Sequence, residues 1–230
     1  MAQRLRFDRD DDTTIEVCIT ERDDGDFGID AQVPGLLGRR QAVMPGAWSV
    51  ARQVHGRTVL DARPGEVGEA DAIVTSERDL PIAVQGADCA PIAVITDRGP
   101  VAVAHAGWRG LQAGVIDAVL DRLDAEGATV RLAVVGPLIG AECYEFSADD
   151  LDRVAGALGD HVRATTREGR PALDLGAGVR EAFRRRGVED VRFVGRCTAC
   201  GATGFSHRAR GEIERHALAI RIISGPDVHA

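Results

Sequence analysis

The feature that most constrains the fold is segment 81–107, PIAVQGADCAPIAVITDRGPVAVAHAG, in which three apolar runs are separated only by short turns. The turns fall at 86–88 and 97–99. PIAVI and VAVAHA flank the second turn, which contains glycine, and therefore predict a β-hairpin. Strands that follow one another this closely have no helix between them, which disfavours a purely doubly wound parallel sheet.

Further elements are predicted on both sides of this segment. Apolar or alternating runs predict strands at 14–20, 48–56, 70–76, 131–137, 191–195 and 218–223, with 58–62 as the hairpin partner of 48–56. Helical spacing predicts helices at 111–127, 147–159 and 174–187, and 21–46 is predicted to be irregular with one short helix. We expect an α+β fold of mixed sheets flanked by helices, formed as a single domain over 1–230.

Composition narrows the classes of partner and of chemistry. The formal net charge of −8 disfavours binding to nucleic acid or to a membrane surface. All 28 basic residues are arginine, which excludes a P-loop, a Schiff-base lysine and a lysine general base. Any phosphate must therefore be held by arginine or by backbone N–H groups.

The cysteines and the first residues indicate a reducing compartment. Five cysteines, at 18, 89, 143, 197 and 200, are odd in number and lack the spacing of a disulfide framework. The start of the chain, MAQRLRFDRDDD, is polar and acidic, and no apolar run approaches the roughly 20 residues of a membrane span. We expect a cytoplasmic protein with reduced thiols.

Three residues with metal-binding side chains lie at or just beyond the ends of apolar strands. They are His55, Cys89 and His105, and strand ends far apart in sequence can meet at one edge of a sheet. A nitrogen and sulfur set of three protein ligands with one open position is the pattern of catalytic zinc. The spacing matches no short zinc motif, so locally hydrogen-bonded histidines and an inert core cysteine are the alternative.

Two further groups carry candidate chemistry. Arg109 follows His105 by four residues at the start of a helix, which suggests an anion site, with a surface ion pair as the alternative. Trp108 could stack on a flat substrate or pack over the hairpin. Cys197 and Cys200 have CxxC spacing, which suits half a zinc ribbon or a redox pair, but inert thiols are favoured.

The motifs QVHG, ADAIVT, GADCAPIAV, AHAGWRG, GPLIGAECYEF and CT…GFSHR together resemble a known family. Its members have long been called multicopper polyphenol oxidases or laccase-domain proteins, have since been recognised as purine nucleoside phosphorylases, and are also called peptidoglycan-editing factors. The motifs run in order from about residue 53 to 208, and HAGWRG after ADC is the most specific of them.

The resemblance implies a four-layer α+β fold, with two mixed sheets packed between helices, similar to the cytotoxic necrotising factor hydrolase fold. It implies zinc held by the histidine of QVHG, the cysteine of ADC and the histidine of HAGWRG, which are His55, Cys89 and His105. Copper could occupy the same site. It also implies phosphorolysis of adenosine, inosine and methylthioadenosine, together with adenosine deamination, so the expected partners are purine nucleosides and phosphate.

The sequence departs from the family pattern in two places. Segment 19–35, ITERDDGDFGIDAQVPG, is shorter than the family's glycine-rich TTR and SLNLG-like stretch and keeps only TER. The family's FFSYRR is GFSHRAR here, which places His207 where a tyrosine is usual. We expect an intact zinc site with an altered substrate preference.

The number of histidines argues against a copper oxidase. A multicopper centre is built mainly from imidazole ligands, whereas this chain has six histidines, and two of them, His216 and His229, lie near the C-terminus. Any oxidase activity would have to come from copper in the zinc position.

The expected chemistry assigns roles to several residues. In phosphorolysis, phosphate attacks C1′ of the ribose through a transition state that resembles an oxocarbenium ion. Without lysine, Arg109 is the candidate for binding phosphate and for catalysis. Asp88 is a candidate proton acceptor or orienter of a zinc histidine, with capping of the 86–88 turn as the alternative. Tyr144, Arg57 and Trp108 are candidates for the substrate pocket.

Two other functions remain open from the sequence. Cys89 and His105 could be the nucleophile and base of a cysteine hydrolase acting on a cell-wall precursor. The chain could also be a zinc-binding protein without catalytic activity. His55 favours a metal site, because a Cys–His dyad leaves that residue unexplained.

Overall fold

The computed structural model describes residues 1–29 and 33–224, and its strands form two six-stranded sheets and a small hairpin. In the first sheet the order β1-β2-β14-β7-β3-β5 comprises Gln3–Asp8, Thr13–Ile19, His216–Ser224, Ile82–Gly86, Ser49–Arg52 and Gly65–Glu69. In the second sheet the order β13-β10-β8-β9-β6-β4 comprises Val191–Phe193, Val130–Val135, Ala90–Thr96, Val101–Ala106, Ala72–Thr75 and Val59–Asp61. The hairpin pairs β11 with β12, Arg163–Thr165 with Pro171–Leu173.

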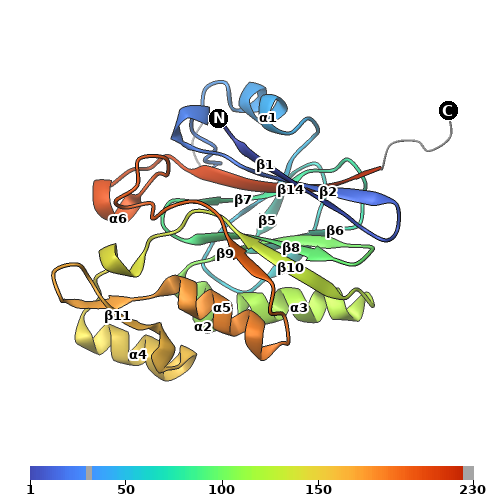
Figure 1. Ribbon diagram of the computed structural model, residues 1–230. Helices are drawn as coiled ribbons and strands as arrows, with labels where there is room; N and C mark the ends of the chain where they lie inside the picture. The colour runs from blue at the N-terminus through green and yellow to red at the C-terminus, as the bar shows by residue number, and fades with distance from the viewer. Residues whose placement is uncertain (30–32, 225–230) are drawn as a thin grey trace.

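The helices cover the outer faces of the two sheets. They are α1 (Leu36–Val43), α2 (Trp108–Ala113), α3 (Val115–Ala125), α4 (Ala148–Leu158), α5 (Leu175–Arg185) and α6 (His207–Arg210), with 3-10 turns η1 (Arg22–Asp24), η2 (Ala141–Cys143) and η3 (Asp160–Val162). Figure 1 shows α1 above the first sheet and α2, α3 and α5 below the second. None of the described helices is long and apolar enough to cross a membrane.

Three buried apolar clusters fill the spaces between these layers. One, around Phe27 and Met44, lies beneath α1, and another, which includes Ile73 and Ile220, lies between the two sheets. The third, which includes Phe183, packs the second sheet against its helices. Burial of apolar surface on both faces explains why the central strands are continuously hydrophobic. The predicted four-layer α+β fold of two mixed sheets is confirmed.

Two short segments pass from one sheet to the other at a common edge. Residues 53–58 connect β3 in the first sheet to β4 in the second. Residues 87–89 connect β7 to β8 and likewise run from the first sheet to the second. Strands β3 and β7 are parallel neighbours, so their carboxyl ends lie at the same edge. The β8–β9 hairpin places Pro91 opposite His105 at that edge. The topology therefore brings His55, Cys89 and His105 together.

One local prediction is confirmed and two differ from the structure. The hairpin around 97–99 is confirmed as β8–β9. The hairpin predicted for 48–56 and 58–62 is wrong: β4 pairs in parallel with β6, because the chain has already crossed to the second sheet. The helix predicted over 111–127 starts earlier and divides into α2 and α3 at Gly114, whose φ of 84° is left-handed.

Candidate active site

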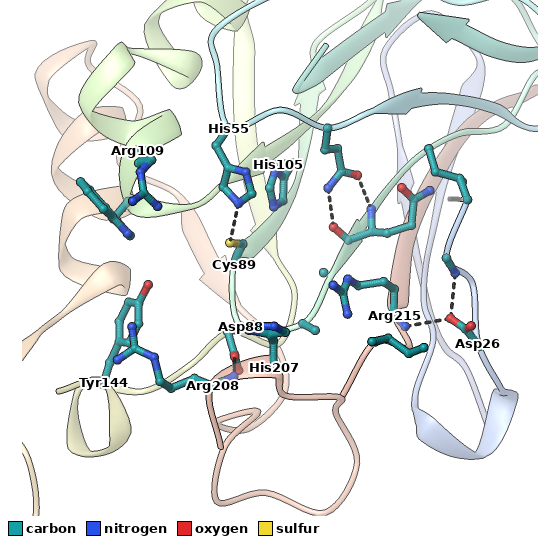
Figure 2. A pocket seen from close by; sticks show the side chains of 18 residues that line it. Asp26, His55, Asp88, Cys89, His105, Arg109, Tyr144, His207, Arg208 and Arg215 are labelled. Carbon is teal, nitrogen blue, oxygen red and sulfur yellow. Dashed lines mark hydrogen bonds between the residues drawn. The ribbon is translucent and has the colours of Figure 1, made fainter. Parts of the chain in front are cut away.

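A cavity of about 680 Å³ opens at the edge where the chain crosses between the sheets. Its volume is in the range of pockets that bind small molecules. Figure 2 shows His55, Cys89 and His105 together, with Arg109 and Tyr144 on one side of them and Arg215 on the other. Residues from the first sheet, the second sheet and the C-terminal loops thus line one hollow.

The three predicted ligands converge in this cavity. One potential ligand atom from each of His55, Cys89 and His105 lies within 4.8 Å of the others. The distance from Cys89 Sγ to His55 Nε2 is 3.7 Å, and the two imidazole rings meet edge to face with centroids 4.9 Å apart. His105 is buried, whereas His55 is exposed at the cavity.

A fully buried carboxylate that sequence reasoning missed positions both histidines. Asp71 Oδ1 lies 2.8 Å from His105 Nδ1, which leaves Nε2 of that ring for Cys89 or a metal. The same carboxylate accepts hydrogen bonds from the backbone N–H groups of Val54, His55 and Gly56, at 3.2, 2.9 and 2.6 Å. These bonds hold His55 at a φ of 60°, a left-handed conformation that is uncommon for residues other than glycine.

The charges in the site stabilise a thiolate. Burial alone would raise the pKa of Cys89, but the positive charge and hydrogen bond of His105, with a hydrogen bond from His55, lower it to about 6. Burial opposes ionisation of His105 as well, yet Cys89 and Asp71 raise its pKa to about 9. The site therefore presents an ionised sulfur at neutral pH, which is the form that binds metals or acts as a nucleophile.

The donor set and its spacing fit zinc. Two imidazole nitrogens and a thiolate are typical zinc ligands, and two ligands of a tetrahedral zinc ion lie about 3.5 Å apart for the usual Zn–S and Zn–N lengths. Gly107 leaves room for this arrangement, because a Cβ there would lie 2.8 Å from Cys89 Sγ and 3.0 Å from His55 Cδ2. Copper also accepts imidazole and thiolate ligands, so the donors alone do not select one metal.

Arg109 and Trp108 form a stacked pair at the cavity wall. The Arg109 guanidinium carbon lies 4.2 Å from the centroid of the Trp108 ring, and Trp108 meets Phe146 edge to face at 6.0 Å. Trp108 thus packs on Phe146 while still lining the cavity. Arg109 is exposed and forms no ion pair within the described residues, so the surface ion pair offered as the alternative is not formed.

The hydrogen bonds of Asp88 go to Thr198 and Arg208, and its predicted part in catalysis stays a prediction. Its Oδ1 accepts a hydrogen bond from the Thr198 hydroxyl at 2.6 Å, and its Oδ2 accepts one from the backbone N–H of Arg208 at 2.7 Å. It lines the cavity with a left-handed φ of 95°. The histidine partner is Asp71, because Asp71 precedes β6, the neighbour of the β9 strand that carries His105.

The remaining predicted pocket residues separate into two groups. Tyr144 is buried and lines the cavity, where the Arg208 guanidinium lies 4.7 Å from its ring centroid. Burial, with the negative charges of Cys89 and Asp88, raises the Tyr144 pKa well above its usual value. Arg57 is not among the cavity-lining residues, because its guanidinium points toward Gly114 at the end of α2. A role for Arg57 in substrate binding stays a prediction.

Several residues that line the cavity could not be identified as pocket residues from the sequence. Gln53 bridges the crossover to β7: its side chain donates to Gln85 O and accepts from Gln85 N, each at 2.8 Å. Asp26 and Arg215 are joined by a hydrogen bond from the Arg215 backbone N–H at 2.8 Å. Arg208 belongs to the GFSHR motif. That motif contributed to the family resemblance, but the sequence predicted no role for Arg208.

The histidines near the C-terminus do not join the trio. His207 lines the cavity, and His216 is fully buried behind it in β14. His229 lies outside the described residues, as do residues 30–32 of the shortened N-terminal segment. Within the described chain, His55 and His105 are the only histidines in a potential metal cluster. This arrangement does not match a multicopper centre, which needs more imidazoles.

A family model described as multi-copper polyphenol oxidoreductase laccase matches residues 35–223. A Mycobacterium tuberculosis protein named purine nucleoside phosphorylase is 37% identical over 180 residues, covering 76% of this chain and 69% of that relative. A Streptomyces coelicolor protein of the same name is 40% identical over 163 residues, covering 68% and 67%.

Solved structures share the fold. Protein NMB0706 of Neisseria meningitidis has a TM-score of 0.77 at 25% identity, with 96% of this chain and 99% of that chain covered. Hypothetical protein YfiH of Bacillus licheniformis also has a TM-score of 0.77, at 23% identity, with 90% and 92% covered. The two-sheet architecture is therefore common to these proteins.

Proposed function

The chain belongs to the multi-copper polyphenol oxidoreductase laccase family, and from this premise we propose that it is a zinc-dependent purine nucleoside phosphorylase. The observation that carries the proposal is that three potential metal ligands face one cavity together with Arg109, which has no carboxylate partner in the described part of the chain. Relatives at 37–40% identity bear this enzyme's name. The proposed substrates are adenosine, inosine and methylthioadenosine with inorganic phosphate.

The cations of the cavity suit an anionic co-substrate. Arg109 extends into solvent at the cavity wall, and Arg208 lies over the Tyr144 ring nearby. Charge-assisted hydrogen bonds from guanidinium groups are the strongest phosphate contacts available to a chain without lysine. We assign phosphate binding to Arg109, with Arg208 contributing positive charge to the same hollow.

The reaction replaces one bond at C1′ of the ribose with another. An oxygen of hydrogen phosphate forms a bond to C1′ while the C1′–N9 bond breaks. The purine departs with that electron pair and gains the proton that hydrogen phosphate gives up, so ribose 1-phosphate and the neutral base are the products. Positive charge develops on the sugar in the transition state. The Tyr144 phenol keeps its proton at neutral pH because its pKa is raised, so it can donate a hydrogen bond to the departing base.

The metal-ligand set has a defined part in this scheme. Zinc bound by His55, Cys89 and His105 would supply a Lewis acid beside the reacting atoms. Asp71 fixes the ring orientation of His105 and the backbone of His55. The Gln53–Gln85 hydrogen bonds hold the crossover that carries His55 against β7.

The test is product analysis of the purified protein with adenosine, with and without phosphate. We expect adenine and ribose 1-phosphate only when phosphate is present, and no product from Cys89→Ala. Cys18→Ala is the matched control, because Cys18 lies in the core beneath α1, away from the cavity. Release of adenine at the same rate without phosphate would show hydrolysis, and inosine as the main product would show deamination. Either result contradicts the proposal.

A metal assay separates the proposal from a cysteine hydrolase. We expect the active protein to contain zinc and to lose phosphorolysis when zinc is chelated. A metal-free protein that is fully active and is inactivated by alkylation of Cys89 would instead identify that thiolate as a nucleophile.

A further inference from the structure

A second set of metal-binding side chains lies outside the cavity. Glu142, Cys143, Cys197 and Cys200 each offer one ligand atom, and these four atoms all lie within 4.8 Å of one another. The first two belong to η2, and the other two belong to the loop after β13. We propose that these four residues form a second, structural zinc site, separate from the site of His55, Cys89 and His105.

The backbone around Cys197 is arranged to hold a thiolate. The Gly140 N–H donates to Cys197 Sγ at 3.1 Å. Hydrogen bonds to the charged form of a group stabilise that form. This amide therefore favours the thiolate form of Cys197, which is the form that binds a metal.

One cation lies beside the cluster in the described part of the chain: the Arg167 guanidinium is 3.3 Å from Cys200 Sγ. A divalent ion among the sulfurs would supply the further positive charge that three thiolates need, because metal coordination deprotonates a thiol.

The four ligands fit zinc and do not fit magnesium or calcium. Thiolates are soft ligands that favour zinc over magnesium or calcium, and four protein ligands close the coordination shell as in structural sites. A disulfide is the competing use of these cysteines. It would engage two sulfurs and leave unexplained the third, and Glu142, which lies 3.6 Å from Cys200 Sγ.

An ion here would join two walls of the cavity. Cys143 precedes Tyr144, and Thr198, within the CxxC turn, donates the hydrogen bond to Asp88. Cross-linking η2 to the loop after β13 would therefore fix the positions of Tyr144 and Asp88 without contact between the ion and the substrate. The site would contribute to folding of these loops and not to the chemical step.

The test is zinc content per chain, measured by mass spectrometry on protein purified under reducing conditions. We expect Cys200→Ser to contain one equivalent less than the wild type, Cys89→Ser to lack a different equivalent, and the double variant to lack both. Cys200 is exposed, so its replacement does not open a cavity in the core. Cys18→Ala, at a cysteine outside both clusters, should keep the wild-type content.

Cobalt substitution gives a second readout that does not depend on activity. In the Cys89→Ser background, bound cobalt should show intense thiolate-to-metal absorption, and the added Cys200→Ser change should abolish most of it. Equal zinc content in the wild type and Cys200→Ser would overturn the proposal, and so would a disulfide among Cys143, Cys197 and Cys200 in the reduced preparation. Both readouts are independent of whether the protein cleaves nucleosides, so failure of one proposal leaves the other standing.

Discussion

Asp71 and His105 form a buried pair, with 2.8 Å between carboxylate Oδ1 and imidazole Nδ1. Because Asp71 also accepts three backbone hydrogen bonds from residues 54–56, it sets the ring orientation of one histidine and the backbone conformation of the other. A carboxylate that holds a ligating imidazole in this way is a common requirement of metal sites.

Replacing Asp71 with asparagine should weaken metal binding while keeping the size of the side chain. The amide nitrogen would face N–H groups, so hydrogen bonds to His105 or to the 54–56 backbone would be lost. We expect a drop in zinc affinity or activity of about 10- to 100-fold, measured by competition with a chelator. Asp61→Asn, at an exposed carboxylate paired with Arg122, is the control and should change neither. Unchanged zinc affinity in Asp71→Asn would contradict the assigned role.

Gly107→Ala should disrupt the trio by steric overlap. The added Cβ would lie 2.8 Å from Cys89 Sγ and 3.0 Å from His55 Cδ2. We expect lower zinc content and a loss of about 1–3 kcal/mol in the free energy of unfolding, the usual cost of overpacking. Urea titration and metal analysis measure both quantities. Gly38→Ala in α1, where a Cβ meets nothing within 4 Å, should be neutral or stabilising.

Arg109→Met should impair use of phosphate. The substitution keeps a long apolar stem that can pack on Trp108 but removes the guanidinium. Charge-assisted hydrogen bonds contribute about 1.5–3 kcal/mol, so kcat/KM for phosphate should fall about ten- to hundredfold. Steady-state kinetics with phosphate varied will measure this. Arg57→Met, outside the cavity, should behave like the wild type. If only the KM for the nucleoside changes, Arg109 binds the nucleoside instead.

His216 should make the fold sensitive to acid. It is fully buried, and burial lowers its pKa from 6.5 to about 4 although its ring nitrogen lies 3.2 Å from Pro137 O. Between those values the unfolded chain binds the proton more readily than the folded one, so stability falls as the pH falls. The loss from pH 7 to pH 5 should be about 2 kcal/mol.

Urea unfolding at both pH values tests this, because His216→Gln should remove that part of the pH dependence. Glutamine can still donate a hydrogen bond toward Pro137. The control is His161→Gln, at an exposed histidine. If His216→Gln and the wild type lose the same free energy between pH 7 and pH 5, another group is responsible.

The sequence predicted that His55, Cys89 and His105 come together, because each ends an apolar run and such ends meet at sheet edges. It failed for Asp71, which lies at the start of a strand and acts through tertiary contacts with two distant segments. The sequence could not show the direction of the Arg57 side chain, which depends on the crossover between the sheets. The same crossover is the reason that the predicted hairpin of 58–62 is wrong. The spacing of residues along the sequence does not show that the chain passes from one sheet to the other after β3.

The neighbours of the CxxC pair could not be read from its spacing. Spacing alone favoured inert thiols at Cys197 and Cys200, and the structure adds that Glu142 and Cys143 of η2, more than 50 residues earlier, lie beside them. Secondary structure in segments with strong periodicity was predictable, as α4 and α5 illustrate. The edge strand β1 was not predictable, because four of its six residues are exposed and its start is polar.

The crossing segments have a consequence for the stability of the sandwich. His55 and Cys89 lie where the chain passes between the sheets, and His105 belongs to the second sheet. An ion could be held by all three residues only when the two sheets are packed against each other. Its binding free energy would be added to that docking, so metal occupancy would report on whether the layers are assembled.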